Sequence, residues 1–346
     1  MWRLHELKQL GGHCCRTVLR HRSTIVNGAS LSTSLPVVYH KAYSRPQLPP
    51  GHRFPMKVFE EIYTRLLHQG LIHPHQVHQP PQTQPLVSET ALHMVHDKDY
   101  LRAFTTMTLN DDQIRRIGFG AACMRNPDVV ERTLAEVAGT LLTARLALQH
   151  GLAVNTAGGT HHAYPAAGSG FCILNDLAVT AKVLLSEGAV GRVAVLDLDV
   201  HQGDGTAVCL QDEPRATTLS VHCQSNFPTR KAVSTLDVGL PDKVDDRGYM
   251  RMLSELIPGV LQDWKPDLVL YDAGVDVHER DSLGRLSLSD QGLARREAMV
   301  LDTCLSAGIP VAGVVGGGYD PDLGVLAERH MHLHRCALAM WQDHKL

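Results

Sequence analysis

The sequence predicts an α/β fold: a single domain with a mostly parallel central sheet and helices on both of its faces. Short apolar runs alternate with helical stretches over the second half of the chain, an order typical of parallel sheets with crossover helices. The runs are almost continuously apolar, as in strands that are buried on both faces. Because neither an internal repeat nor a boundary follows residue 36, we predict one domain over residues 36–346.

The first part of this domain is expected to contain a short strand and two helices. The strand lies at 35–39, and apolar residues three or four positions apart predict a helix over 55–69: Met56, Phe59, Ile62 and Leu66. The segment 72–86 is rich in His, Gln and Pro and is expected to be irregular, because proline interrupts helices. A long amphipathic helix over 127–150 is ended by Gly151.

The alternation of strands and helices then follows in order. The predicted strands are Leu152–Asn155, Val193–Val200, Thr217–Val221, Leu268–Asp272 and Pro310–Val315. The predicted helices between them are Asp176–Glu187, Tyr249–Trp264 and Asp290–Ala307. Strands of four to eight residues and helices of eleven or more are both within the usual range, roughly 3–10 and 8–20 residues.

Composition excludes several classes of protein. The net charge of −3 provides no global basic field, so direct nucleic-acid binding is not expected. No apolar stretch approaches the roughly 20 residues of a membrane helix, so no membrane association is expected either. The eight cysteines form no C-x-x-C pair and fit a reducing compartment. The sequence leaves the oligomeric state open.

The first 35 residues differ from the rest of the chain. They carry five Lys and Arg residues against one acid, Glu6, and contain several serines. A basic, serine-containing leader of this kind predicts a transit peptide for a mitochondrion or a chloroplast. The alternative is a disordered N-terminal tail on a nuclear or cytoplasmic protein.

The predicted strands end in His, Asp, Gly and Tyr residues. In open parallel sheets, ligands bind outside the carboxyl ends of the strands. Five such ends are therefore expected to converge on one pocket: Gly158 to His162, Asp197 to Gly205, Ser220 to His222, Asp272 to Asp276 and Gly316 to Tyr319.

Two carboxylates and one imidazole in this set, Asp199, His201 and Asp276, are candidate metal ligands. Side chains two apart on a strand point to the same side, so Asp199 and His201 can bind one cation together. Three protein ligands leave a fourth position for water or substrate, as in catalytic zinc sites, although Fe(II) and Mn(II) tolerate the same donors. The alternative is a buried hydrogen-bond network, which would be costly with so many acids.

Candidate catalytic groups lie beside these ligands in the sequence. His161 and His162 can move protons near neutral pH, and Asp197 and Asp204 are available to orient them. Tyr319 follows three glycines, which allow the backbone to approach a ligand closely and direct the phenol into the pocket as an oxyanion donor.

Taken together, these motifs resemble the histone deacetylase superfamily, which has the arginase–deacetylase fold. The matching strings span about residues 36–340: Gly158–Ala163, Gly168–Cys172, Asn175-Asp176, Asp197–Gly205, Gly274–Asp276 and Gly316–Tyr319. Some features resemble the class IV and bacterial-type branch: Gln202, Arg132, Gly139-Thr140 and Asp281–Gly284. Asp204 departs from class IV, where asparagine is usual.

The resemblance implies a role for each matching position. It implies one zinc ion on Asp199, His201 and Asp276, with His161 and His162 as the acid/base pair, Asp197 and Asp204 as their partners, and Tyr319 as donor to the carbonyl oxygen. It places four residues along an acyl tunnel: Gly170, Phe171, Phe227 and Leu283. It also implies a structural potassium or sodium ion on side-chain or backbone oxygens of Asp197, Asp199, His201, Ser220 and Val221.

The activity implied is zinc-dependent hydrolysis of N-ε-acyl-lysine in a protein or histone, with a metal-bound water attacking the amide. The alternative within the same fold is a small-molecule amidohydrolase acting on acetylated polyamines, which an acidic pocket mouth would favour. The acidic cluster Asn110–Asp112 is the candidate for such a mouth, or for an aspartate that holds a peptide backbone. A third possibility is a non-catalytic scaffold. The His330, His332 and His334 cluster predicts no second metal site, because positions two apart on a helix face different directions.

Overall fold

The computed structural model describes residues 34–80 and 86–346, all of which belong to one compact unit. The leader prediction concerns residues 1–35 and lies almost entirely outside the described residues, so a targeting role stays a prediction. Within the described ranges, none of the helices has the length and hydropathy that crossing a bilayer requires.

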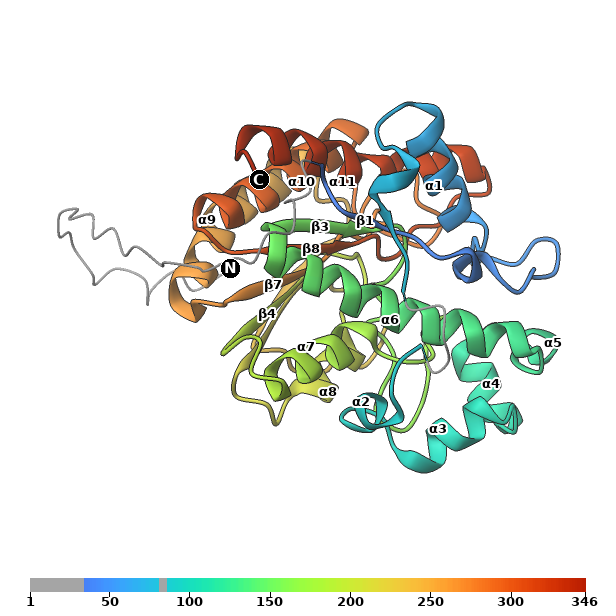
Figure 1. Cartoon of the computed structure of the whole chain (residues 1–346). Coiled ribbons are helices and arrows are strands. Elements are labelled where there is room, and N and C mark those ends of the chain that lie inside the picture. Colours follow the sequence, from blue (N-terminus) through green and yellow to red (C-terminus); the bar gives the residue numbers. More distant parts are fainter. Residues whose placement is uncertain (1–33, 81–85) are drawn as a thin grey trace. The chain divides into compact units, whose positions relative to one another are not determined.

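Eight strands in the described part of the chain form one sheet, and every pair of neighbours is parallel (Figure 1). Their order across the sheet is β2-β1-β3-β8-β7-β4-β5-β6. The strands are β1 (Val37–Val38), β2 (Val77–His78), β3 (Leu152–Asn155), β4 (Val193–Asp197), β5 (Ala216–Cys223), β6 (Leu236–Leu240), β7 (Leu268–Asp272) and β8 (Val311–Val314). The predicted α/β fold with a parallel sheet is confirmed.

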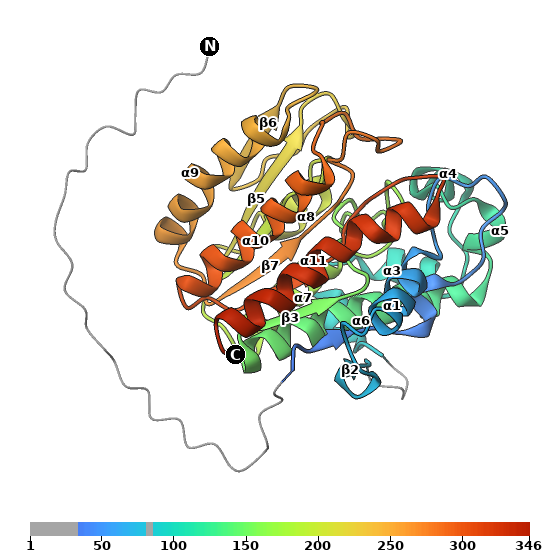
Figure 2. The ribbon, with the colours of Figure 1, turned by 90° about the horizontal axis from the view of Figure 1, so that it is seen from above.

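Helices cover both faces of the sheet (Figures 1 and 2). One face is covered by α1 (Val58–His68), α9 (Asp246–Trp264), α10 (Asp290–Ser306) and α11 (Leu323–Asp343). The other face is covered by α6 (Pro127–His150), α7 (Asp176–Ser186) and α8 (Asp204–Leu210). Beside α6 and α7 lie four short helices: α2 (Glu89–His93), α3 (Lys98–Thr105), α4 (Asp111–Ile117) and α5 (Ala121–Met124).

The helices begin and end where local chemistry predicts. The long helix α6 begins after Asn126, whose side chain accepts a hydrogen bond from the Asp128 N–H, and Pro127 occupies its first position. It ends at Gly151, which has a φ of 90° and is the terminating residue that the sequence indicated. Two 3₁₀ helices, η1 (Lys41–Ser44) and η2 (Pro74–Gln76), lie in the first part of the domain.

The structure corrects several predicted bounds. The strand predicted over Val193–Val200 ends at Asp197, because the Asp199 N–H bonds the Asp197 carboxylate at 3.1 Å instead of a neighbouring strand. The segment 72–86, predicted as irregular, contributes η2 and the short edge strand β2. Sequence reading did not predict β6 or the short helices α2–α5 and α8.

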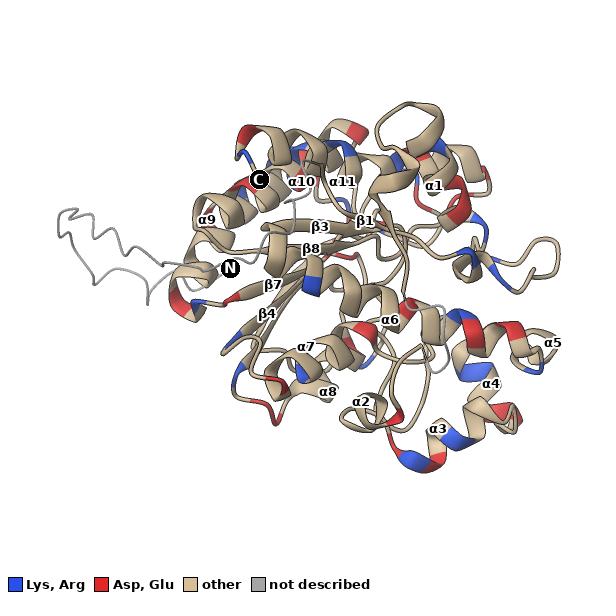
Figure 3. Cartoon of the chain, viewed as in Figure 1, with Lys and Arg blue, Asp and Glu red and all other residues tan. Residues whose placement is uncertain are grey.

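Strand register brings polar residues to one end of the buried sheet. The strands β3, β4, β7 and β8 are fully buried. On β4, Asp197 is the last residue and lies opposite Ser220 of β5 on one side and Asp272 of β7 on the other. The outer helices α3 and α4, by contrast, carry exposed acidic and basic residues (Figure 3). The sheet therefore concentrates its buried charges at the carboxyl ends of its central strands.

Candidate active site

The three predicted metal ligands lie together just beyond the ends of β4 and β7. The imidazole Nδ1 of His201 lies 3.0 Å from Asp199 Oδ1 and 2.9 Å from Asp276 Oδ2. One ligand atom from each of the three residues lies within 4.8 Å of the others, and all three residues are buried. This arrangement of two carboxylates and one imidazole has the donor chemistry of a site for a divalent cation.

Backbone N–H groups fix the remaining carboxylate oxygens. Asp199 Oδ2 accepts a hydrogen bond from the Gly317 N–H at 2.9 Å, and Asp276 Oδ1 accepts one from the Val200 N–H at 2.8 Å. These bonds orient the two carboxylates without using the oxygens that approach His201. Outer contacts of this kind hold ligands in place for a metal ion.

The pKa values of these ligands show the cost of burying them together. Burial and the neighbouring Asp199 raise the pKa of Asp276 to about 8. Burial alone would lower the pKa of His201, but Asp276 and Asp199 outweigh burial and raise it to about 10. Asp276 and His201 thus retain protons that a divalent cation would replace, since metal ligands bind in their deprotonated forms. The residues fit a metal ion.

Each histidine of the adjacent pair has its own aspartate. His161 Nδ1 lies 2.8 Å from Asp197 Oδ2, and His162 Nδ1 lies 2.6 Å from Asp204 Oδ1. Asp204 is the first residue of α8, and its second oxygen accepts a hydrogen bond from the Tyr164 hydroxyl at 2.7 Å. Tyr164 was not singled out from the sequence, because its distance from Asp204 along the chain hides the contact.

The two imidazoles differ in charge although they are neighbours in sequence. Burial and the nearby His161 lower the pKa of His162 to about 4, so this ring is neutral at physiological pH. Burial would also lower the pKa of His161, but the carboxylates of Asp197 and Asp199 outweigh it and raise the pKa well above its usual value. The pair therefore offers a proton acceptor and a proton donor side by side.

Tyr319 is held in the wall of the site by the loop that carries Asp281. The Tyr319 N–H donates to Asp281 Oδ2 at 2.7 Å, and the Ser282 N–H donates to the Tyr319 carbonyl at 2.9 Å. The ring centroids of Tyr319 and His201 are 6.3 Å apart, with the planes nearly perpendicular. Burial and Asp276 raise the pKa of the Tyr319 phenol well above its usual value, so it remains a hydrogen-bond donor.

The three glycines before Tyr319 allow close packing against the ligands. A Cβ atom at Gly317 would lie 2.7 Å from Asp199 Oδ2 and 2.7 Å from Asp276 Oδ2. Gly316 has a φ of 61°, and a Cβ there would overlap the Asp272 carboxylate. Glycine is thus required at the positions where we predicted that the backbone approaches a ligand closely.

A cavity of about 600 Å³ opens onto these groups. The four predicted tunnel residues line it, namely Gly170, Phe171, Phe227 and Leu283. His162, His201 and Tyr319 also line it, and the ring of Phe227 packs edge-on against His162 at a centroid distance of 4.9 Å. The structure therefore brings the predicted tunnel residues, His162, Tyr319 and the metal ligand His201 to one cavity.

A smaller cavity of about 40 Å³ lies on the inner side of the same site. It shares His161, His162 and Tyr319 with the site and extends to Arg132 and Glu136 of α6. Arg132 binds Glu136 through two hydrogen bonds, of 2.9 and 3.1 Å, and both side chains are buried. From the sequence, Arg132 was identified only as one of the features that resemble the class IV and bacterial-type branch.

The residues of the predicted potassium or sodium site also lie close together. Asp197 and Ser220 face each other across β4 and β5, and Val221 follows on β5. Asp197 Oδ1 accepts from the Asp199 N–H, and Ser220 Oγ lies 3.0 Å from His222 Nδ1. A monovalent cation at this position stays a prediction.

Asp272 is a buried acid to which the sequence assigned no role. It is 0% exposed, its two oxygens have no hydrogen-bond partner among the described residues, and Oδ2 lies 3.7 Å from His161 Nδ1. Together with His161 and Asp197 it forms a second group of possible ligands. Burial and Asp197 raise its pKa well above the usual value. Its position opposite Asp197 in the register is the signal that could have identified it.

The acidic cluster Asn110–Asp112 does not reach the cavity. It forms the start of α4, where Asn110 caps the helix, while the end of α4 lines the cavity with Arg116 and Ile117. That this segment supplies an acidic mouth or a backbone-binding aspartate stays a prediction, which the lining of the cavity does not support.

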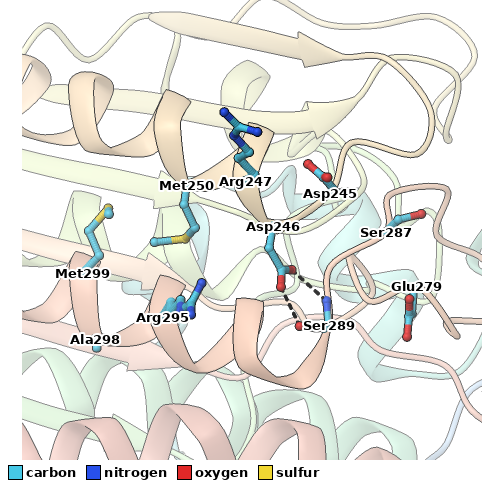
Figure 4. Close-up of a pocket in the computed structure, with 10 residues that line it drawn as sticks. All are labelled: Asp245, Asp246, Arg247, Met250, Glu279, Ser287, Ser289, Arg295, Ala298 and Met299. Atoms are coloured by element: carbon cyan, nitrogen blue, oxygen red, sulfur yellow. Dashed lines mark hydrogen bonds between the residues drawn. The ribbon is translucent and has the colours of Figure 1, made fainter.

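A second surface cavity, of about 830 Å³, lies between α9, α10 and the loop before α10 (Figure 4). It contains none of the predicted site residues. Its carboxylate Asp246 is bonded to the N–H and the hydroxyl of Ser289 at 2.8 and 2.6 Å, as the dashed lines in Figure 4 mark. This cavity lacks the grouping of metal ligands and proton-transfer residues found in the first.

Comparison with known proteins agrees with this site. Residues 52–334 match the histone deacetylase domain. The chain belongs to the histone deacetylase family. An uncharacterized protein of Picosynechococcus is 51% identical over 302 residues, covering 87% of this chain and 98% of that protein. The superfamily predicted from the motifs is confirmed, whereas the assignment to the class IV or bacterial-type branch stays a prediction.

More distant relatives of this deacetylase-family chain come from plants and bacteria. Histone deacetylase 2 of Arabidopsis thaliana is 26% identical, covering 78% of this chain and 70% of that protein. The acetoin utilization protein AcuC of Staphylococcus aureus (strain MRSA252) is 29% identical, covering 78% and 72%. The crystal structure of the HDA15 HD domain superimposes with a TM-score of 0.73 at 20% identity, covering 88% of this chain and 89% of that one. The last comparison shows the shared fold.

Proposed function

We propose that this deacetylase-family hydrolase removes acyl groups from the ε-amine of lysine in a protein or peptide, using one zinc ion held by Asp199, His201 and Asp276. The observation that carries the proposal is the convergence of His162 and Tyr319 on the cavity that His201 also lines. A long acyl-lysine side chain requires such a narrow, partly aromatic cavity with polar groups at its inner end. A zinc ion bound there would supply Lewis acidity toward the amide carbonyl and a water of lowered pKa.

The residues of the chain supply the proton transfers. Neutral His162, oriented by Asp204, accepts the proton of the attacking water. The phenol of Tyr319 donates a hydrogen bond to the carbonyl oxygen, on which negative charge develops as the carbon becomes tetrahedral. The departing amine then needs a proton, which the imidazole pair can return. Gly170, Phe171, Phe227 and Leu283 hold the acyl-lysine chain along the cavity and exclude water.

The proposal extends to the structural potassium or sodium ion beside Asp197. Such an ion would lie behind His161 and balance part of the charge that Asp197, Asp199 and Asp272 bring to the buried site. The support for it is the proximity of its five predicted ligands and the excess of buried acids.

Replacement of Tyr319 by phenylalanine tests the assignment of the oxyanion donor. With Tyr319→Phe, we expect kcat on acyl-lysine peptides to fall by about 100-fold or more, the effect of removing one such donor. Tyr63→Phe is the matched control, because Tyr63 stacks on Tyr39 at a centroid distance of 3.9 Å and does not line the cavity. Turnover should be measured with acetyl-, butyryl- and myristoyl-lysine peptides, which also reveals the preferred acyl length.

Two results would count against the proposal. One is a wild-type rate for Tyr319→Phe on every peptide of the panel. The other is purified protein that contains no stoichiometric transition metal and keeps its activity after chelation. Re-addition of zinc, iron and manganese to the chelated protein identifies the metal that supports turnover.

A further inference from the structure

The mouth of the catalytic cavity carries arginines that have no acidic partner. Arg116, at the end of α4, and Arg230, on the loop after β5, both line the cavity and are exposed. Among the described residues neither forms an ion pair. Two positive charges thus face the space through which a substrate enters.

The acid that lines the same cavity cannot neutralise them. Asp204 is 1% exposed, and its two oxygens bind His162 and Tyr164 at 2.6 and 2.7 Å. Arg116, in turn, lies over the outer side of this group, with its guanidinium carbon 4.9 Å from the centroid of the Tyr164 ring. The guanidinium therefore has a defined position at the mouth, although its charge remains free for a ligand.

A third arginine borders the neighbouring cavity. This neighbouring cavity, of about 530 Å³, shares Leu283 and Tyr319 with the catalytic cavity. It is also lined by Arg53, which is exposed. Its acid, Asp320, is 2.9 Å from the buried guanidinium of Arg329 and is therefore already paired. Arg53, Arg116 and Arg230, which we call the rim arginines, come from three separate segments that line these two adjoining cavities.

The loop that carries Arg230 is fastened in place. The ammonium of Lys231 donates to the carbonyl oxygens of Asn226 and Pro228 at 2.6 and 2.7 Å. The Asn226 side chain donates in turn to the carbonyl of Leu283 at 2.8 Å. A fixed loop holds the positive charge of Arg230 near the entrance, and Lys231 adds to the local positive potential.

We propose that the rim arginines select an acyl-lysine that is flanked by acidic residues. This inference rests on the proposed function and names its substrate class. An unpaired positive rim attracts an anionic segment, accelerates its association and repels a cationic one. Acetylated polyamines and lysine-rich tails carry positive charge next to the acyl amide, so the rim disfavours both. Arginine can bind a carboxylate that flanks the acyl-lysine through two parallel hydrogen bonds.

The test compares three peptides with the same central acetyl-lysine and with Glu/Asp, Gln/Ser or Lys/Arg flanks. With the full chain loaded with its metal, we expect kcat/KM for the acidic peptide to exceed that for the neutral peptide by about tenfold at low salt. The basic peptide and an acetylpolyamine should be the poorest substrates. The preference should shrink as the salt concentration rises from about 0.02 M to about 0.5 M, since exposed charges are screened.

Substitutions of the rim arginines show whether these residues, and not another property of the peptides, cause the preference for acidic flanks. In Arg230→Gln and Arg53→Gln, the ratio of kcat/KM between the acidic and neutral peptides should fall toward one, and in Arg230→Glu it should invert. Arg295→Gln is the matched control, because Arg295 is also exposed but lines the other surface cavity (Figure 4). Its ratio should equal that of the wild type.

Failure of this inference can be distinguished from failure of the proposed function. If the wild type cleaves the neutral and acidic peptides equally, or prefers the basic one, the inference is wrong while lysine deacylation stands. If none of the peptides is cleaved by metal-loaded protein, the proposed function fails and the inference fails with it. A salt-independent acidic preference that survives in Arg230→Glu would also overturn the role of the rim.

Discussion

At the scale of single residues, the properties of the site depend on which carboxylate contacts which imidazole. Asp204 shares its oxygens between His162 and Tyr164, whereas Asp197 binds His161 and lies next to Asp272. A histidine paired with an aspartate is therefore neutral in one case, His162, and charged in the other, His161, although the two rings lie a few ångströms apart. Chemistry that both accepts and returns a proton needs that difference.

Replacement of Asp204 by asparagine should test this assignment. The Asp204 carboxylate raises the pKa of His162 against the effect of burial, so its removal should lower that pKa further. We expect kcat to fall by about 10- to 100-fold, because His162 becomes a weaker base. The acid limb of the pH profile of kcat/KM should move to lower pH. A loss of activity with an unmoved limb would mean that Asp204 acts only through the fold.

The Gly317→Ala substitution should act on the metal ligands with little effect on the rest of the fold. The new Cβ would lie 2.7 Å from one oxygen of Asp199 and one of Asp276, so these carboxylates must move. We expect metal affinity to fall by about 10- to 100-fold, as when an outer contact of a ligand is lost. Competition with a chromogenic chelator measures the affinity, and circular dichroism checks the fold. Unchanged affinity would show that the ligands tolerate the displacement.

The site was predictable from sequence to the extent that it depends on strand ends. The residues Asp199, His201 and Asp276 follow buried strands directly, so the topology of a parallel sheet alone brings them together. Asp272 and Tyr164 could not be found in this way. Their roles depend on the register of β4 against β7 and on a turn that returns to α8, and neither has a local signal.

At the scale of secondary-structure elements, the long helices and buried strands were predictable because their patterns extend over many residues. The edge strands β2 and β6 were missed because they are short or only partly buried, which leaves no continuous apolar run. The short helices α2–α5 span four to eight residues, too few for a helical period to emerge. Capping residues such as Ser88, Asp97 and Asn110 mark their starts in retrospect.

Within α9, the glycine at position 259 offers a stabilising substitution. Gly259 is exposed and inside the helix, and a Cβ atom there would meet nothing within 4 Å. Gly259→Ala should raise the free energy of unfolding by about 0.5–1 kcal/mol, since alanine restricts the unfolded chain and has the higher helix propensity. Urea denaturation measures the difference, and Gly188→Ala is the contrasting case. Gly188 also has open space but a φ of 68°, so its replacement by alanine should destabilise the protein.

At the scale of the whole molecule, burial of neutral histidines links stability to pH. Burial is the main cause that lowers the pKa of His96 to about 4, of His330 to about 3 and of His334 to about 4. His96 joins two motifs: its Nε2 accepts from the Asn175 N–H at 2.9 Å, and its Nδ1 lies 3.1 Å from the Tyr164 carbonyl oxygen. A second proton on His96 would remove the acceptor for Asn175 at the start of α7.

The sign of the pH dependence follows from these lowered pKa values. In the unfolded chain the three histidines take up protons near pH 6.5, while in the folded protein they stay mostly neutral until the pH approaches about 4. Stability should therefore be complete above about pH 6.5 and fall as the pH drops toward 4, by about 1.4 kcal/mol per pH unit for each histidine. Urea titrations at successive pH values measure this slope. His96→Gln should make this slope shallower. The control is His75→Gln, at an exposed position, whose slope should equal that of the wild type. Equal slopes for the two variants would show that His96 does not link folding to pH.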